Sequence, residues 1–133
     1  MADYYGFCLC GNAKFEVQGK VDGSYLCHCR HCQKDTGSAH AANLFSKSAR
    51  LKWLSGADSV TTFTLSGTCH KISFCKFCGS SMPGIHQDGL LVIPAGCLDT
   101  PVTIRPNAHI FTSSKAGWDK DLYDVPEFCR LPE

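Results

Sequence analysis

The chain is most constrained by the stretch from Tyr25 to Cys32, YLCHCRHC, which places three cysteines and two histidines within six residues. So many soft ligands side by side suit a disulfide knot, a structural metal site, a catalytic metal site or a redox centre. The remaining cysteines help to decide among these. The sequence has ten, and seven of them fall into three clusters: Cys8-x-Cys10, Cys27-x-Cys29-x-x-Cys32 and Cys75-x-x-Cys78.

The setting and spacing of the cysteines favour metal binding over disulfides. The N-terminal stretch MADYYGFCLC has no basic segment followed by an apolar one, so it does not resemble a secretory signal. The longest apolar run, residues 90–95, is too short to span a bilayer. We therefore expect a soluble, cytoplasmic protein with no membrane partner, where thiols are more often metal ligands than disulfides. C-x-x-C is also the usual spacing of zinc ligands.

Short strand-like segments predict a mainly β fold. Helical periodicity is nearly absent, and we expect only short helices, one turn after Cys32 and another around Lys115–Leu122. The length of 133 residues, with 44% hydrophobic and 19% charged residues, predicts one globular domain over residues 1–133. The expected strands are β-branched, aromatic or alternating segments separated by turn formers: residues 13–18, 59–65, 71–74, 90–93 and 102–104.

The clusters divide most simply into one closed and one open zinc site, which gives two Zn²⁺ ions per chain. Cys75 and Cys78 form a zinc knuckle in which Gly79 can take the positive φ that lets backbone amides approach the sulfurs. Cys8 and Cys10 supply the two ligands that this knuckle lacks. A closed site of four cysteines has no open position, so its role is structural.

Cys27, Cys29 and Cys32 then remain as three sulfurs that one tight turn can aim at a single ion. The fourth position is left for water or substrate, as in catalytic zinc sites. A closed site with one histidine is the alternative. His28 lies between two ligands and should point away from the metal, which makes His31 the better candidate for a fourth ligand.

Other reactive side chains have simpler interpretations. Cys69, Cys97 and Cys129 are expected to act as small apolar residues, although Cys69 precedes the strand into the knuckle and could lie near a metal. His86 and His109 are isolated in the sequence. Lys34 with Asp35 is most simply a solvated turn.

The charge pattern argues against a nucleic-acid partner. The formal net charge is +1 with neutral thiols, and two zinc ions on seven thiolates would lower it to about −2. The largest basic cluster, Arg50-Leu51-Lys52, is too slight for a surface that binds a phosphate backbone.

The order of the clusters resembles the glutathione-dependent formaldehyde-activating enzyme family, which also includes centromere protein V. The motifs that carry the resemblance run through nearly the whole chain: Gly6-x-Cys8-x-Cys10-Gly11, Cys27-His28-Cys29-x-x-Cys32, Thr36-Gly37-Ser38, Phe74-Cys75-x-x-Cys78-Gly79, Ala95-Gly96-Cys97-Leu98-Asp99, His109-Ile110-Phe111 and Trp118. The family commonly has serine or threonine where this chain has Cys97.

The resemblance implies folded antiparallel sheets of the β-tent type that contain zinc. It implies the same division of metals, with a structural zinc on Cys8, Cys10, Cys75 and Cys78 and a catalytic zinc on the other three. The implied activity is condensation of formaldehyde with glutathione to S-hydroxymethylglutathione, formally a carbon–sulfur lyase reaction in reverse.

These observations give a first hypothesis and two alternatives. The first is a zinc-dependent enzyme of the carbon–sulfur lyase type that adds a small-molecule thiol such as glutathione to an aldehyde such as formaldehyde. His31, Thr36 and Ser38 adjoin the ligands and are candidates to hydrogen-bond an alkoxide or move a proton. The alternatives are a non-catalytic, zinc-stabilised binding module and a thiol redox centre, which zinc coordination of the three cysteines would exclude.

Overall fold

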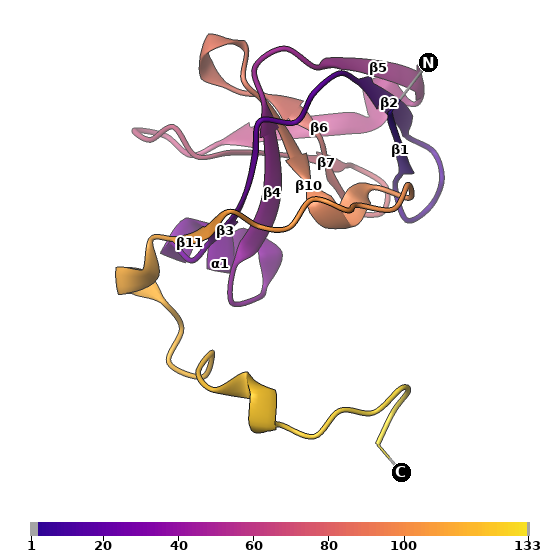
Figure 1. The fold of residues 1–133 in the computed structure, drawn as a ribbon. Helices are drawn as coiled ribbons and strands as arrows, with labels where there is room; N and C mark the ends of the chain where they lie inside the picture. The colour runs from indigo at the N-terminus through magenta and orange to yellow at the C-terminus, as the bar shows by residue number, and fades with distance from the viewer. Residues whose placement is uncertain (1–2, 133) are drawn as a thin grey trace.

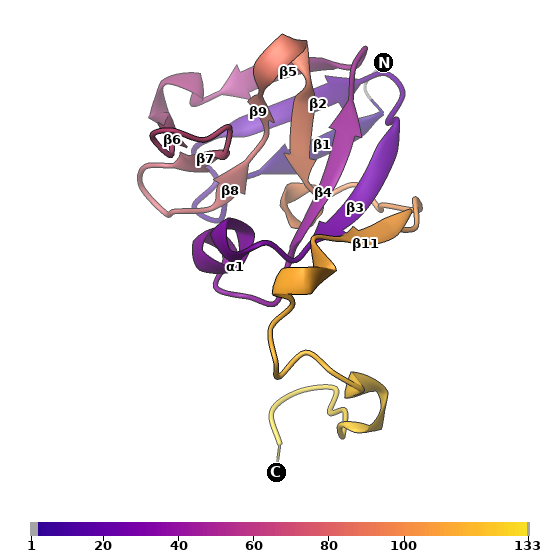
Figure 2. The ribbon, with the colours of Figure 1, turned by 90° about the vertical axis from the view of Figure 1, so that its left-hand side faces the viewer.

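The predicted mainly β architecture is confirmed in a computed structural model that describes residues 3–132. Within that range the chain forms eleven strands in three sheets and one short α-helix. All strand pairs are antiparallel except one. Figures 1 and 2 show the sheets gathered into one body from which the C-terminal segment leads away.

The first sheet has the order β1–β2–β5 and comprises β1 (Tyr4–Phe7), β2 (Lys14–Gln18) and β5 (Arg50–Ser55). The alternation that predicts β2 also sets its faces, since Phe15 and Val17 are fully buried. The sheet therefore presents one apolar face to the interior.

The other two sheets carry the remaining strands. The third sheet has the order β6–β7–β8, from β6 (Val60–Thr64), β7 (Lys71–Cys75) and β8 (Ser81–Met82). The second sheet has five strands, and its β11–β3 pair is the parallel one. In sheet order its strands are β11 (Ala108–Ile110), β3 (Gly23–Cys27), β4 (Ala41–Ser46), β10 (Leu91–Pro94) and β9 (Gly84–Ile85).

The helical turn expected after Cys32 is present, but the helix begins earlier than expected. Helix α1 (Arg30–Thr36) begins before Cys32 and includes it, with Cys29 as its N-cap and Gly37 as its left-handed C-cap. Five short 3₁₀ turns complete the helical content: η1 (Ala57–Ser59), η2 (Gln87–Gly89), η3 (Ala95–Cys97), η4 (Thr112–Ser114) and η5 (Leu122–Asp124).

Two other element predictions are wrong. The helix expected around Lys115–Leu122 is absent, and only η5 starts at its last residue. The strand expected over residues 102–104 is irregular, because the segment has no strand partner and lies between Pro101 and Pro106, neither of which can donate a ladder hydrogen bond.

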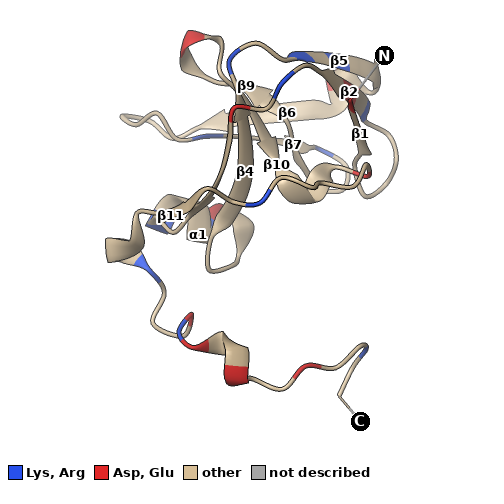
Figure 3. Ribbon diagram, viewed as in Figure 1, with Lys and Arg blue, Asp and Glu red and all other residues tan. Residues whose placement is uncertain are grey.

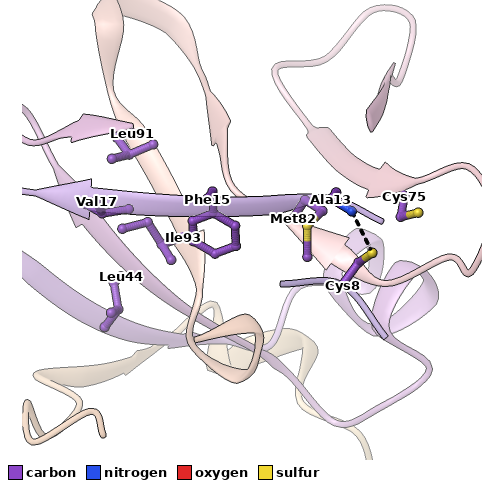
Figure 4. Packing of buried hydrophobic residues seen from close by; sticks show 9 residues of the cluster. All are labelled: Cys8, Ala13, Phe15, Val17, Leu44, Cys75, Met82, Leu91 and Ile93. Atoms are coloured by element: carbon purple, nitrogen blue, oxygen red, sulfur yellow. Dashed lines mark hydrogen bonds between the residues drawn. The ribbon is translucent and has the colours of Figure 1, made fainter. Parts of the chain in front are cut away.

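All three sheets contribute to one main hydrophobic core, drawn in Figure 4. Phe15 of β2 meets Trp53 of β5 edge to face, with ring centroids 5.6 Å apart. Cys8 and Cys75 are fully buried members of the same core, so the cluster to which they belong is anchored to it. The core side chains are Cys8, Ala13, Phe15, Val17, Leu44, Cys75, Met82, Leu91 and Ile93.

The C-terminal segment contributes little to this packing. Residues 121–132 are all exposed, and the chain leads away from the sheets after η4 (Figure 2). No helix within residues 3–132 is long and apolar enough to cross a membrane. Basic and acidic residues are dispersed along the chain rather than gathered by sign (Figure 3).

Candidate metal centres and the adjoining cavity

The fold brings Cys8, Cys10, Cys75 and Cys78 together, with their sulfurs all within 4.8 Å of one another. Cys8 and Cys10 lie in the loop after β1, and Cys75 ends β7. The Sγ atoms of Cys8 and Cys10 are 3.6 Å apart, and those of Cys10 and Cys75 are 3.9 Å apart. Gly79 has φ 75°, which confirms the positive φ predicted for the residue after the knuckle. A single ion between these strands would therefore join the first sheet to the third.

The chemistry of this cluster fits a divalent cation. The Ser80 hydroxyl lies 3.4 Å from Cys78 Sγ and lowers the pKa of that thiol to about 5. Although the backbone of Asn12 acts in the opposite direction, the neighbouring Cys8 raises the pKa of Cys10 to about 11. Four adjacent sulfurs cannot all ionise without a compensating charge, and zinc bound by four thiolates supplies one.

The second cluster consists of Cys27, Cys29 and Cys32, whose sulfurs also lie within 4.8 Å of one another. Cys27 ends β3, Cys29 caps α1, and Cys32 lies in the first turn of the helix. Cys29 Sγ accepts a hydrogen bond from the Cys32 N–H at 3.4 Å. The turn that caps the helix thus gathers all three sulfurs. Neither His28 nor His31 brings a nitrogen into the group.

The thiols of this second cluster differ in their tendency to ionise. Burial raises the pKa of both Cys27 and Cys32. Burial opposes ionisation of Cys29 as well, but the Cys32 N–H and the neighbouring sulfurs hold the pKa of Cys29 below its ordinary value. Three soft donors of this kind suit a zinc ion with a fourth position free.

A cavity of about 580 Å³ adjoins the three-cysteine cluster. The cysteine cluster and α1 form one part of its wall, and residues 68–73, before and within β7, form another. Strands β4 and β10 also contribute to the lining. Its apolar lining includes Phe45, Ile72, Met82, Leu90, Val92, Ile110 and Phe111, and its polar lining includes His31, Asp35, Thr36, Asn43, His70, Lys71 and His86.

His28 points away from the cluster, as expected, but His109 is not isolated as the sequence suggested. The His28 side chain is fully buried, and its Nε2 lies 2.8 Å from Nδ1 of His109. Its Nδ1 is 3.6 Å from Asp119 Oδ2. The parallel pairing of β11 with β3 places His109 beside this strand end. The second sheet thus holds His28, the residue between Cys27 and Cys29 in the sequence, in place.

The residues suggested for substrate contact lie in different settings. His31 and Thr36 line the cavity, whereas Ser38 is exposed and is not part of the lining. Thr36 Oγ1 donates to the Cys32 carbonyl at 2.7 Å and accepts from the Ser38 N–H at 3.2 Å. The Thr36 hydroxyl and the Ser38 N–H therefore help to end α1. Of these two residues, only Thr36 lines the cavity.

The structure also reveals a pair that the sequence analysis missed. His70 Nε2 lies 2.5 Å from Oδ2 of Asp35, and both residues line the cavity. Asp35 therefore lies in α1 rather than in a turn, and it has a specific partner. Cys69, next to His70, also lines the cavity, although it is not part of either cysteine cluster. No local spacing could indicate a pair that is 35 residues apart.

A solved structure supports the fold. A Rhodobacter sphaeroides protein has a crystal structure that matches with a TM-score of 0.58 and 19% sequence identity. The match covers 79% of this chain and 98% of the other. At this identity the likeness concerns the arrangement of the strands alone.

Comparison with protein families gives a more specific result. Residues 3–114 match the family described as glutathione-dependent formaldehyde-activating enzyme. The matched range includes all three cysteine clusters and the residues that line the cavity. The chain therefore belongs to the family of glutathione-dependent formaldehyde-activating enzymes.

Proposed function

We propose that this protein is a zinc-dependent enzyme of the carbon–sulfur lyase type that adds a thiol such as glutathione to a small aldehyde such as formaldehyde. The observation that carries the proposal is the group of three cysteine sulfurs beside a cavity of about 580 Å³. Membership of the family suggests this activity at the family level. We further propose that residues 1–133 act as one domain in the cytoplasm.

The two cysteine clusters would hold two zinc ions with different roles. Cys8, Cys10, Cys75 and Cys78 would bind a structural ion, and Cys27, Cys29 and Cys32 a catalytic one. Zinc at the second site would polarise an aldehyde oxygen or favour the thiolate form of a bound thiol. The apolar cavity wall would exclude water from the reacting groups, and His31 and Thr36 would present polar groups close to the sulfurs.

NMR exchange spectroscopy of glutathione with formaldehyde, with and without the protein, tests this function. We expect the zinc-loaded protein to increase the exchange rate and Cys29→Ser to abolish the increase. Elemental analysis should find two zinc ions in the wild type and one in the variant. A wild type that carries two zinc ions but leaves the exchange rate unchanged would favour the non-catalytic binding module instead.

A further inference from the structure

The cavity contains a hydrogen-bonded pair that belongs to neither metal cluster. His70 precedes β7 in the β6–β7 hairpin, and Asp35 lies in α1. Their side chains are only 18% and 17% exposed, and His70 Nε2 lies 2.5 Å from Asp35 Oδ2. Both residues line the cavity beside Cys27, Cys29 and Cys32. The pair thus faces the same space as the open metal site.

The contact with Asp35 determines which nitrogen of His70 is available. A carboxylate accepts hydrogen bonds, so in the neutral form of His70 the proton lies on Nε2 and the lone pair on Nδ1. Within residues 3–132, Nδ1 has no hydrogen-bond partner, and it is not among the fully buried atoms. The backbone N–H of His70 donates to Thr68 Oγ1 at 3.0 Å, which holds the residue in its turn. A basic nitrogen oriented by a carboxylate is the arrangement of a general base.

Among the side chains around His70, Asp35 is the one that can stabilise a proton on the imidazole. His31 of α1 stacks obliquely at 5.2 Å between ring centroids, and Lys71 and His86 line the same cavity. These neighbours are neutral or cationic. Asp35 is the one carboxylate among the described residues that line the cavity. It is in direct contact with His70 and can compensate the positive charge of a protonated imidazole.

We propose that His70 and Asp35 form the proton-transfer dyad of the thiol addition, a role that rests on the function proposed above. His70 Nδ1 accepts the thiol proton while the sulfur forms a bond to the aldehyde carbon. The π electrons of the carbonyl move onto its oxygen, and the imidazolium returns the proton to that oxygen. The product is a hydroxyalkyl thioether, His70 ends neutral, and nothing is oxidised or reduced. The same steps in reverse release the thiol and the aldehyde.

A purely structural role is the alternative, because the contact also ties the β6–β7 hairpin to α1. Two variants separate the roles. His70→Gln keeps an N–H that can donate to Asp35 but has no basic nitrogen. Asp35→Asn keeps a hydrogen-bonding side chain but removes the charge. A structural contact would tolerate both changes, whereas proton transfer would tolerate neither.

The test combines exchange rates with the state of His70 itself. We expect His70→Gln to lower the glutathione–formaldehyde exchange rate at least ~100-fold, as for loss of a general base, with zinc content and melting temperature unchanged. Asp35→Asn should lower the rate less and should shift the pH profile of the rate. In the wild type, ¹⁵N NMR at a pH where His70 is neutral should find its proton on Nε2.

Each contrary result has a distinct meaning. His70→Gln with the wild-type rate and pH profile would overturn the dyad and leave the proposed function intact. A neutral His70 protonated on Nδ1 would also overturn it, whatever the activity. A wild type that does not accelerate exchange would overturn the proposed function, and the dyad with it.

Discussion

At the scale of single residues, the environment of each cysteine decides its chemistry more than its position in the sequence does. Seven cysteines are gathered in two clusters, and three are not. Cys69 and Cys129 are exposed, whereas Cys97 is largely shielded, and burial raises the pKa of Cys97 to about 12. Since only the thiolate reacts as a nucleophile, the three should differ in reactivity.

Alkylation of the zinc-loaded protein with iodoacetamide at pH 8 should therefore be selective. We expect Cys69 and Cys129 to be labelled first and Cys97 at least ~100-fold more slowly, because almost none of it is ionised. Mass spectrometry of peptides after timed quenching measures the order. Labelling of Cys97 as fast as Cys129 would contradict its shielding, and labelling in denaturant is the control.

His86 should make stability sensitive to acid. Burial, assisted by the charge of Lys71 and by that of His70 when it is protonated, holds the pKa of His86 below its ordinary value of about 6.5. The unfolded chain then binds a proton at higher pH than the folded one does. His86 therefore contributes fully above about pH 6.5, and this stability is lost as pH falls from there to the lowered folded pKa.

His86→Gln removes that titration. The free energy of unfolding of the wild type should decline more steeply than that of the variant between pH 7.5 and the acid end of this window, as measured by urea denaturation at a series of pH values. Comparing the two proteins cancels the acid sensitivity of the metal sites, which they share. Parallel pH curves would show that burial does not disfavour the charged form of His86.

At the scale of elements, β1 approaches the segment after β10 so closely that only glycine fits. A Cβ on Gly6 would lie 2.3 Å from the carbonyl oxygen of Cys97 and 2.4 Å from Cζ of Phe15. Gly6→Ala should lower the free energy of unfolding by roughly 1–3 kcal/mol, as for an overpacked core. Gly96→Ala is the matched control, because a Cβ there meets nothing within 4 Å. Equal urea midpoints for the two variants would contradict the close approach.

The two cysteine clusters connect different lengths of chain, so loss of a ligand should affect them differently. Cys75→Ser breaks a cluster that links the β1–β2 loop to the end of β7. The variant should lose much of the free energy that metal binding contributes to folding, which can match the ~5–15 kcal/mol stability of a whole domain. We therefore expect it to be unfolded or insoluble. Cys29→Ser affects one six-residue turn and should remain folded with one zinc ion.

Circular dichroism, zinc content and melting curves of both variants measure this asymmetry. Their shared control is Cys129→Ser, which changes an exposed cysteine outside both clusters. A folded Cys75→Ser protein beside an unfolded Cys29→Ser protein would mean that the structural and catalytic roles are reversed.

At the scale of the whole molecule, the sheets and the C-terminal segment contribute unequally to stability. Removal of residues 121–133 should change the free energy of unfolding by less than ~0.5 kcal/mol, because residues 121–132 are all exposed. Removal of residues 115–133 should cost more, since it also takes away Asp119, which lies 3.6 Å from the buried His28. Thermal melting of the two truncated proteins measures the difference, and equal losses would show that Asp119 contributes nothing.

The sequence by itself determined the features that depend on near neighbours. The C-x-C and C-x-x-C spacings fix which sulfurs can share a local turn, and the alternation of residues 14–18 fixes the buried face of β2. The family motifs are local in the same sense, so family membership was also predictable. The strand expected at residues 102–104 shows the limit, because β-branched residues form a strand only where a partner is present.

Only the tertiary structure decided what meets across long stretches of chain. Cys10 and Cys75 are 65 residues apart. His28 and His109 are 81 residues apart, and the parallel β11–β3 pairing brings their side chains together. The contact between Asp35 and His70, on which the proton-transfer proposal rests, joins residues that are 35 positions apart in the sequence. Such contacts form because the three sheets bury a common core and bring loops together at its edge. No local propensity encodes that geometry, since it arises from the packing of all the elements at once.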